Sequence, residues 1–211
     1  MTLSDAELAA ARAATVARQA PIVDGLSQRG GLRRDIQGSL EEVGTPDLQV
    51  ALLLLDLDDF KMLNDSFGHA AGDGVLCAIA ARLVAVVGPS DRAYRLGGDE
   101  FVVLHVGPGG STELSELATS VLAAVRRPFD RSELDPAAAE LAGRHITCSV
   151  GVAPARPGDR ADDLLGRADG AMFVAKDKHG LRGVRGDSYA VFDEIPEEGV
   201  PPHLRDQFKK P

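Results

Sequence analysis

The segment Gln-Val-Ala-Leu-Leu-Leu-Leu (residues 49–55) runs without a break into Asp-Leu-Asp-Asp (residues 56–59). A short continuous apolar run of this kind is typical of a β-strand that is buried on both faces. The carboxylates at its end repel one another unless a cation lies among them. The segment therefore predicts a central strand that ends at a cation site or, in the simpler interpretation, at solvated aspartates that cap a helix.

The apolar spacing on both sides of this strand predicts further elements. Apolar residues recur at intervals of three and four in segments that we interpret as helices: 28–42, 73–87, 112–126 and 161–178. Short segments rich in β-branched and aromatic residues are interpreted as strands: 92–96, 101–106, 145–152 and 189–192. The strand at 145–152 alternates in polarity, so we expect it to have one buried face.

The order of these elements predicts the class of fold. Gly97 and Gly98 separate two of the strands, which indicates a hairpin whose tip tolerates positive φ. Residues 128–143 show no regular pattern. Helices alternate with the remaining strands, which predicts a single-domain α/β sandwich of two or three layers. Periodicity alone does not give the order of the strands in the sheet.

The two ends of the chain differ from its middle. Residues 1–20 are rich in alanine and predict a helix that Pro21 ends. Residues 185–211 contain the last predicted strand and a tail of prolines and charges that we expect to be poorly ordered. The expected organisation is therefore a short helix, a main domain over residues 21–184, and an appendage.

The composition excludes several classes of protein. The chain has 211 residues and a formal net charge of −9, and no basic patch that would favour binding to nucleic acid is visible. Cys77 and Cys148 lie in apolar runs and are expected to be core residues. Unbroken apolar runs are shorter than a membrane span, and the N-terminus lacks the pattern of a signal peptide. We therefore expect a soluble, cytoplasmic protein that does not contact a membrane.

A second group of polar residues lies at the hairpin tip, in Gly97-Gly98-Asp99-Glu100. On its own this sequence is a common turn. Together with the acidic end of the buried strand, however, it could bring two carboxylate clusters to one edge of the sheet. Mg²⁺ prefers carboxylate, carbonyl, water and phosphate oxygens, and two-metal phosphoryl transfer uses such clusters.

A third polar segment runs from Asn64 to Asp73 and contains Gly68 and Gly72. Asn and Asp side chains can read the hydrogen-bonding edge of a base, and glycines allow the backbone to approach a ligand. The simpler interpretation of this segment is a turn followed by a helix that is capped by an aspartate.

These segments carry a resemblance to a known family. Residues 95–101 (Arg-Leu-Gly-Gly-Asp-Glu-Phe), together with residues 56–73, resemble the two signature blocks of the GGDEF family of diguanylate cyclases. Weaker similarity at 147–153 and 168–176 extends the resemblance over residues 22–184. It implies a central, mainly antiparallel mixed sheet flanked by helices, as in nucleotide cyclases and polymerase palm domains, and it implies that two GTP molecules are joined into cyclic di-GMP with release of two pyrophosphates.

The resemblance assigns residues to the metal and to catalysis. Asp56, the backbone carbonyl of Leu57, Asp99 and Glu100 would hold Mg²⁺ or Mn²⁺. Glu100 and Asp99, with Lys61, would be the catalytic residues, and Glu100 would assist deprotonation of the attacking 3′-hydroxyl.

The resemblance also assigns the residues that bind GTP. Asn64 and Asp73 would read the guanine edge, whose donor pair adenine lacks. Backbone N–H groups near Asp59, Phe60 and Lys61 would contact phosphates. Lys61, and Lys176 on the last helix, would supply positive charge to the triphosphate.

Partners follow from the same resemblance. Each chain would bind one GTP, so bond formation would require a homodimer, at least a transient one. The helix over residues 1–20 lies where family members often carry a signalling helix. Control by a separate sensor or regulatory protein is therefore one expectation.

Three blocks depart from the family pattern. The product-inhibition motif Arg-x-x-Asp is Gly-Pro-Ser-Asp at residues 88–91, so we expect no strong feedback inhibition there. The early block at 21–29 lacks its leading Asp and its Thr. After Lys176 the late block loses its usual basic residue, for which Lys178 or Arg182 could substitute.

These departures leave alternatives open. One is a catalytically weak or inactive GGDEF module that binds GTP or a protein partner. Another is a related cyclase or polymerase-like enzyme with a different substrate, although Asn64 and Asp73 argue against adenine.

Overall fold

The computed structural model of the protein describes residues 25–41, 43, 48–108, 110–182 and 188–195. The helix expected over residues 1–20 and the tail beyond residue 195 lie outside the described residues, as does the turn expected at 44–47.

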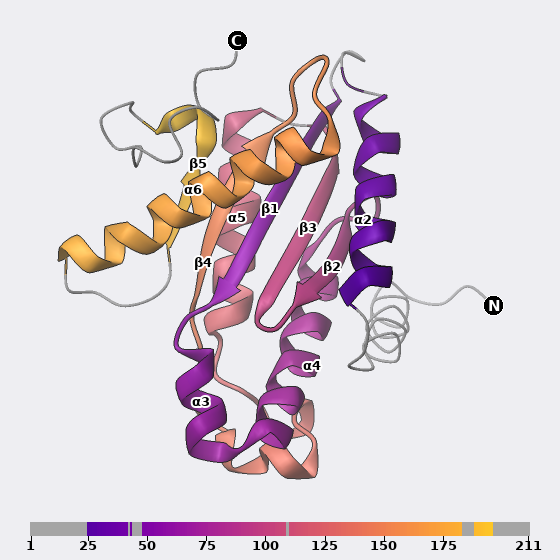
Figure 1. Ribbon diagram of the computed structural model, residues 1–211. Coiled ribbons are helices and arrows are strands. Elements are labelled where there is room, and N and C mark those ends of the chain that lie inside the picture. Colours follow the sequence, from indigo (N-terminus) through magenta and orange to yellow (C-terminus); the bar gives the residue numbers. More distant parts are fainter. Residues whose placement is uncertain (1–24, 42, 44–47, 109, 183–187, 196–211) are drawn as a thin grey trace.

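A five-stranded sheet forms the centre of the molecule, in the order β2-β3-β1-β4-β5 (Figure 1). The strands are β1 (Gln49–Leu57), β2 (Arg92–Gly97), β3 (Glu100–Gly107), β4 (Cys148–Pro154) and β5 (Ser188–Val191). All neighbouring pairs are antiparallel except β4 and β5, which run parallel. The predicted sandwich with a mainly antiparallel mixed sheet is confirmed.

Strand β1 lies in the middle because its sequence suits burial on both faces. Leu53 and Leu55 point into a core formed with α4 (His69–Val86) and α5 (Ser111–Arg126). Leu52 and Leu54 point into a second core on the other face, which contains residues of α2 (Gly25–Leu40) and α6 (Ala161–Arg182). The protein therefore has three layers, with α2 and α6 on one face of the sheet and α4 and α5 on the other (Figure 1).

One helix, α4, is long and apolar enough to span a membrane by length and composition alone, with a mean hydropathy of 1.4. More than half of it, 56%, is buried inside the protein. This burial is typical of a core helix, because its apolar side chains already pack against the sheet and against α5.

Below the sheet, in the view of Figure 1, the short helix α3 (Phe60–Phe67) joins β1 to α4, and two 3₁₀ turns, η1 (Arg131–Glu133) and η2 (Pro136–Leu141), follow α5. A third, η3 (Phe192–Glu194), follows β5. The irregular character predicted for residues 128–143 fits these short turns.

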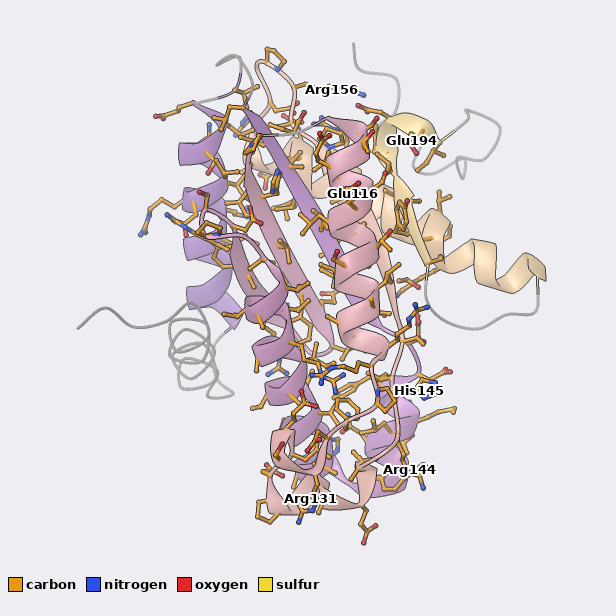
Figure 2. All side chains as sticks on the ribbon, turned by 180° about the vertical axis from the view of Figure 1, so that it is seen from behind. Glu116, Arg131, Arg144, His145, Arg156 and Glu194 are labelled. Atoms are coloured by element: carbon orange, nitrogen blue, oxygen red, sulfur yellow. The ribbon has the colours of Figure 1, made fainter. Side chains whose placement is uncertain are left out.

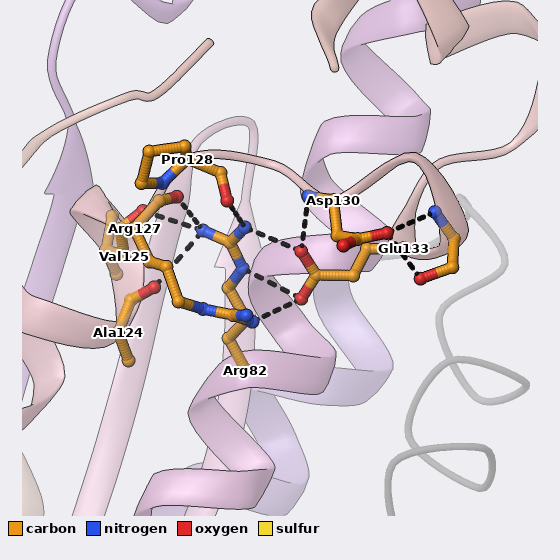
Figure 3. Close-up of polar contacts among 8 residues, drawn as sticks. Arg82, Ala124, Val125, Arg127, Pro128, Asp130 and Glu133 are labelled. Carbon is orange, nitrogen blue, oxygen red and sulfur yellow. Dashed lines mark hydrogen bonds and ion pairs between the residues drawn. The ribbon is translucent and has the colours of Figure 1, made fainter. Parts of the chain in front are cut away.

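A buried arginine of α4 connects η1 and the end of α5 through hydrogen bonds (Figure 3). Arg82 of α4 has a side chain that is only 3% exposed, and its guanidinium donates to both carboxylate oxygens of Glu133 at 3.3 and 2.8 Å. It also stacks 4.5 Å from the ring of Phe129. The same guanidinium donates to the carbonyls at the end of α5, those of Ala124, Val125, Arg127 and Pro128. Because the last carbonyls of a helix lack intrahelical partners, Arg82 acts as a cap.

The structure corrects three of the sequence interpretations. The helix α3 was not predicted. Asp73 caps no helix, since α4 begins at His69, with Gly68 at its N-cap position. The one-faced burial expected for the strand at 145–152 is wrong, because the described part of β4 is buried on both faces up to Ala153.

The second buried face of β4 carries small residues, and this is why its polarity pattern was misleading. The helix α6 packs so closely on this face that a Cβ at Gly151 would lie 2.1 Å from the carbonyl oxygen of Ala168. Of the two expected core cysteines, Cys148 is buried and Cys77 is partly exposed.

Candidate active site

Two carboxylates from different strands face each other where β1 ends. Asp56 of β1 is the antiparallel partner of Glu100, the first residue of β3. Such cross-strand pairs project to the same face of the sheet with Cβ atoms about 5 Å apart. The ammonium of Lys176, from α6, lies 2.9 Å from Asp56 Oδ1. The register of the sheet pairs Asp56 with Glu100, and the packing of α6 adds Lys176, so three of the predicted site residues lie together.

The electrostatics of this pair are unfavourable for two ionised carboxylates. Burial raises the pKa of Asp56, Lys176 opposes this effect, and the charges of Asp99 and Asp58 add to it. Burial also raises the pKa of Glu100, with further contributions from Asp56 and Asp99 and from Asp169 of α6. Burial is the largest cause for both groups and the neighbouring carboxylates add to it, and Lys176 offsets these effects only in part.

The hairpin tip brings a third acidic residue to the same place. Gly97 and Gly98 adopt φ values of 147° and 56°, which only glycine accepts easily. Arg95 fixes the tip by donating from Nε and Nη2 to the carbonyl of Gly98 at 3.1 and 2.7 Å. The N–H of Leu57 donates to the carbonyl of Asp99 at 3.3 Å. The predicted ligand positions at the end of β1 and at the hairpin tip are therefore adjacent.

The donor set fits a hard divalent cation. Among the residues that the structure describes, no group of three or more His, Cys, Asp or Glu side chains is arranged to hold a metal ion by itself. Mg²⁺ does not require one, because it is usually held by one or two carboxylates together with substrate phosphates and waters. Asp56 and Glu100, with the backbone carbonyl of Leu57 and with Asp99 nearby, supply donors of this type.

Three hydrogen bonds connect the loop after β1 to the residues around the start of β4. The N–H of Asp58 donates to the carbonyl of Thr147 at 2.8 Å. The hydroxyl of Thr147 donates to Asp58 Oδ2 at 2.8 Å, and the hydroxyl of Ser149 donates to Oδ1 at 3.0 Å. The next residue, Asp59, has a φ of 56°. Among the described residues it is the only one other than glycine with a positive φ. Backbone in this region costs free energy and is found most often at functional sites.

This loop opens into the N-terminus of α3. No side chain caps the helix. The first N–H groups of a helix have no intrahelical acceptor and attract anions. Phe60 is buried and Lys61 is exposed on this first turn. The predicted phosphate contacts at Asp59, Phe60 and Lys61 therefore lie on one uncapped helix start.

The predicted guanine-reading residues lie on two neighbouring helices, α3 and α4. The side-chain oxygen Oδ1 of Asn64 is buried and has no hydrogen-bond partner among the described residues. It lies against Gly72, where a Cβ would be only 1.9 Å away. Asp73, the residue after Gly72, is partly exposed on α4. A buried polar atom without a partner is costly, so this arrangement is typical of a site that receives a ligand.

Sequence reasoning missed several residues of the site. The roles that the family resemblance implies do not include Asp58, Thr147 or Ser149, although all three lie within its blocks. Asp169 and Arg95 also lie within these blocks and have no implied role. Their side-chain contacts depend on the pairing of distant segments, so the signature blocks were the available signal.

Asp91, which matches the aspartate of the product-inhibition motif, forms hydrogen bonds within the protein through both of its carboxylate oxygens. Asp91 Oδ1 lies 2.9 Å from His105 Nδ1 and accepts the N–H of Val106, while Oδ2 accepts the N–H of Gly88. Burial opposes ionisation, but these hydrogen bonds hold the pKa of Asp91 below its usual value. Absence of feedback inhibition at this position stays a prediction.

Comparisons with known proteins agree with this geometry. The sequence model described as "Diguanylate cyclase, GGDEF domain" matches residues 23–182. The diguanylate cyclase VdcA of Vibrio cholerae is 35% identical over 144 residues, which cover 68% of this chain and 41% of VdcA. The chain therefore spans less than half the length of this relative.

Solved structures give the same result for the fold. The GGDEF domain of TpbB from Pseudomonas aeruginosa has a TM-score of 0.66 at 30% identity, covering 77% of this chain and 88% of that domain. The diguanylate cyclase SiaD from Pseudomonas aeruginosa, solved with its activator SiaC, has a TM-score of 0.61 at 29% identity, covering 71% and 55% of the two chains.

Proposed function

Because the chain belongs to the GGDEF family of diguanylate cyclases, we propose that it condenses two GTP molecules into cyclic di-GMP and releases two pyrophosphates. The observation that carries this proposal is the pairing of Asp56 with Glu100 at the end of the central strands. Their excess negative charge lies beside an uncapped helix start and an unpartnered buried amide. A metal-bound triphosphate and a purine base would complement these features.

The guanine base would bind between α3 and α4. Asp73 would accept hydrogen bonds from N1–H and the exocyclic amine of guanine, and Asn64 would bind the same edge. Gly72 leaves room for the Asn64 side chain, since any larger residue would overlap with its oxygen. Adenine lacks this pair of donors, so the pocket would discriminate against ATP.

The triphosphate would lie along the start of α3. The N–H groups at the start of α3, near Asp59, Phe60 and Lys61, would donate to its oxygens. The ammonium groups of Lys61 and Lys176 would add positive charge in a chain whose net charge is −9. Lys176 would then shift from its present contact with Asp56 toward a phosphate.

The carboxylates would bind the metal ion, and one of them would accept a proton. Asp56, Asp99, Glu100 and the carbonyl of Leu57 would hold Mg²⁺ or Mn²⁺. When bound, the ion would neutralise charge on the triphosphate and favour ionisation of the 3′-hydroxyl. Glu100 would accept the proton of that hydroxyl as its oxygen bonds to the α-phosphorus of the second GTP and the bond to pyrophosphate breaks.

Two chains would be needed for turnover. Each chain offers one guanine site, so the two GTP molecules would meet across a homodimer. The proposal places this activity in the cytoplasm, in a domain over residues 21–184, with residues 1–20 as a signalling-type helix and residues 185–211 as an appendage. SiaD, which was solved with an activator, supports the idea of a separate regulatory protein.

The test is incubation of the purified chain with GTP and Mg²⁺, followed by chromatography of the products. We expect cyclic di-GMP and pyrophosphate from the wild type and almost none from Glu100→Gln. Glu116→Gln, an equal change of charge on the exposed face of α5 (Figure 2), is the matched control and should retain activity. Absence of cyclic di-GMP from the folded wild type would contradict the proposal.

A second candidate is a module that binds GTP without turnover. The altered blocks at residues 21–29 and after Lys176 favour it, because they lack residues of the family pattern. In the same assay this candidate predicts GTP binding that Asp73→Ala weakens, with no product.

A further inference from the structure

A groove of about 490 Å³ lies beside the site just described, between α3 and the segment that leads into β4. It is distinct from the guanine pocket: Asn64 and Phe60, the residues of α3 next to Gly72, do not line it. Its volume is within the usual range for small-molecule sites.

The floor of the groove is apolar. Phe129, Leu141 and Ile146 are core residues that reach it from one side, and Leu63 and Phe67 reach it from α3. Its residues are: Asp58, Asp59, Met62, Leu63, Ser66, Phe67, Phe129, Leu141, Arg144, His145, Ile146 and Thr147. Met62, at the rim, is an exposed methionine, and the flexible side chain of methionine adapts well to bound apolar groups.

Met62 is that rim residue, and it is 59% exposed. Phe173 is the other large hydrophobic side chain that is exposed in the described part of the chain, and it belongs to α6. The exposed apolar surface of α3 is therefore concentrated at the groove.

The opposite rim carries positive charge. The guanidinium of Arg144 lies 4.9 Å from the ring centroid of Phe67, and His145 follows it (Figure 2). Among the described residues, no carboxylate forms an ion pair with Arg144. A guanidinium that is stacked on an aromatic ring keeps its N–H groups at its edge, where they can bind an anion.

One of the two acidic residues of the groove is already bound by other donors. Both oxygens of Asp58 already accept hydroxyl hydrogen bonds, from Thr147 and Ser149. The groove thus has an apolar floor and a cationic rim, which complement a ligand with an apolar body and an anionic group.

We propose that this groove binds a small amphipathic anion, in which an aromatic or branched aliphatic group carries a carboxylate, sulfonate or phosphate. The anionic group pairs with Arg144, and the apolar group lies on Phe67, Leu63 and Ile146. A small molecule suits the volume of the groove and the single guanidinium on its rim better than an extended protein surface would.

Binding in the groove affects the GTP site through a shared loop. Asp58 and Asp59 line the groove and also connect Asp56 to the start of α3. Since Asp58 is bonded to Thr147 across the groove, a ligand that separates or clamps these segments changes the position of the first N–H groups of α3. This coupling rests on the proposed binding of GTP, whereas the groove itself does not.

The direct test is a titration of the full chain with 8-anilinonaphthalene-1-sulfonate, an aromatic sulfonate whose fluorescence rises in apolar sites. We expect saturable binding to one site. Arg144→Gln should weaken it about fivefold, the effect of losing one partly exposed charge pair. Ser66→Trp, which fills the groove, should abolish it.

Two controls locate the site. Arg131→Gln changes an exposed arginine on η1 at the same end of the molecule and should bind the probe as the wild type does (Figure 2). Asn64→Ala changes the guanine pocket and should also leave probe binding unchanged. Equal binding by the wild type, Arg144→Gln and Ser66→Trp would overturn the proposal, as would loss of binding in Asn64→Ala or no binding at all.

Thermal unfolding of each variant shows whether a loss of binding reflects misfolding. If Ser66→Trp does not unfold cooperatively, Arg144→Gln decides the outcome, because an exposed arginine can be replaced without disturbing the core. Tighter binding of an acidic amphipathic peptide than of the sulfonate would overturn the small-molecule assignment in favour of a protein partner.

The coupling is measured separately by titrating GTP with and without a saturating concentration of the probe. We expect the dissociation constant for GTP to change about threefold or more. No change would refute the coupling, while failure of the chain to make cyclic di-GMP would refute the proposed function and leave the titration of the probe unaffected.

Discussion

Two ionic clusters in this molecule have opposite electrostatics. Around Arg82, one buried guanidinium satisfies Glu133 and the carbonyl groups at the end of α5. Around Asp56 and Glu100, burial and, to a smaller extent, the charges of neighbouring carboxylates raise the pKa of both carboxyls, and Lys176 offsets only part of this effect. The first cluster is complete within the protein and is structural. The second leaves its carboxylates only partly compensated, which is what the proposed cation site requires.

The largest effect is expected on the structural side. Arg82→Met leaves Glu133 without its main partner and exposes the α5 carbonyls to an apolar side chain, so the free energy of unfolding should fall by about 3–5 kcal/mol. Urea denaturation measures this loss. Arg131→Met is the surface control.

The double variant Arg82→Met/Glu133→Leu should recover part of the loss, because no uncompensated carboxylate then remains. If Arg82→Met is as stable as the Arg131→Met control, the interpretation of the first cluster as structural is wrong.

In the cluster of Asp56 and Glu100, a substitution should change the enzymatic activity more than the stability. Glu100→Gln removes a carboxylate that is repelled by its neighbours, so the free energy of unfolding should stay within about 0.5 kcal/mol of the wild type or rise. The rate of cyclic di-GMP formation should fall by about 100-fold or more. A variant that unfolds at much lower urea concentration would show that Glu100 serves the fold.

A third change tests the unpartnered amide. Gly72→Ala places a Cβ against Asn64 Oδ1 and should displace that side chain, which raises the Michaelis constant for GTP and lowers stability by about 1–3 kcal/mol. Gly38→Ala on α2 is the control, since no atom lies within 4 Å of its Cβ position.

Gly38→Ala should be neutral or slightly stabilising, as alanine favours helix. Should Gly72→Ala bind GTP as tightly as the wild type, Asn64 would have no role in the pocket.

The smallest effect concerns pH. Although burial opposes ionisation, the hydrogen bonds from Arg82 and Asp130 lower the pKa of Glu133 below its ordinary value of 4.5. A lowered pKa means that the contribution of Glu133 is present above about pH 4.5 and is lost as the pH falls through its value in the folded state.

Glu133→Gln should therefore flatten the decline in stability below pH 4.5 while lowering stability at pH 7. Urea midpoints between pH 3 and pH 7 measure both changes. An unchanged acid limb would mean that other carboxyls, such as Asp91 or Asp159, account for the acid sensitivity.

Much of the fold follows from local patterns. The run at residues 49–55 identified the central strand, and the helices and the hairpin were located to within a few residues. The short helix α3 could not be predicted, because it has no capping side chain and follows a residue with positive φ. The two-sided burial of β4 depends on close packing against α6. Small residues such as Gly151 allow this packing, but their presence in the sequence does not predict it.

The site is predicted less completely. Local sequence showed acidic strand ends, but the pairing of Asp56 with Glu100 depends on strand register between distant segments, and here the family resemblance supplied what periodicity could not. Arg82 gave no signal, since an arginine within an amphipathic helix usually faces solvent. Its role depends on the end of α5 packing beside α4.

The central claim is that the carboxylates of Asp56, Asp99 and Glu100 recruit a divalent cation together with GTP. Calorimetric titration of the full chain with 3′-deoxy-GTP, which lacks the attacking hydroxyl, tests it without turnover. We predict binding about tenfold tighter or more in Mg²⁺ than in EDTA, with this gain lost in Asp56→Asn. Equal affinity in Mg²⁺ and EDTA for the wild type would contradict the account.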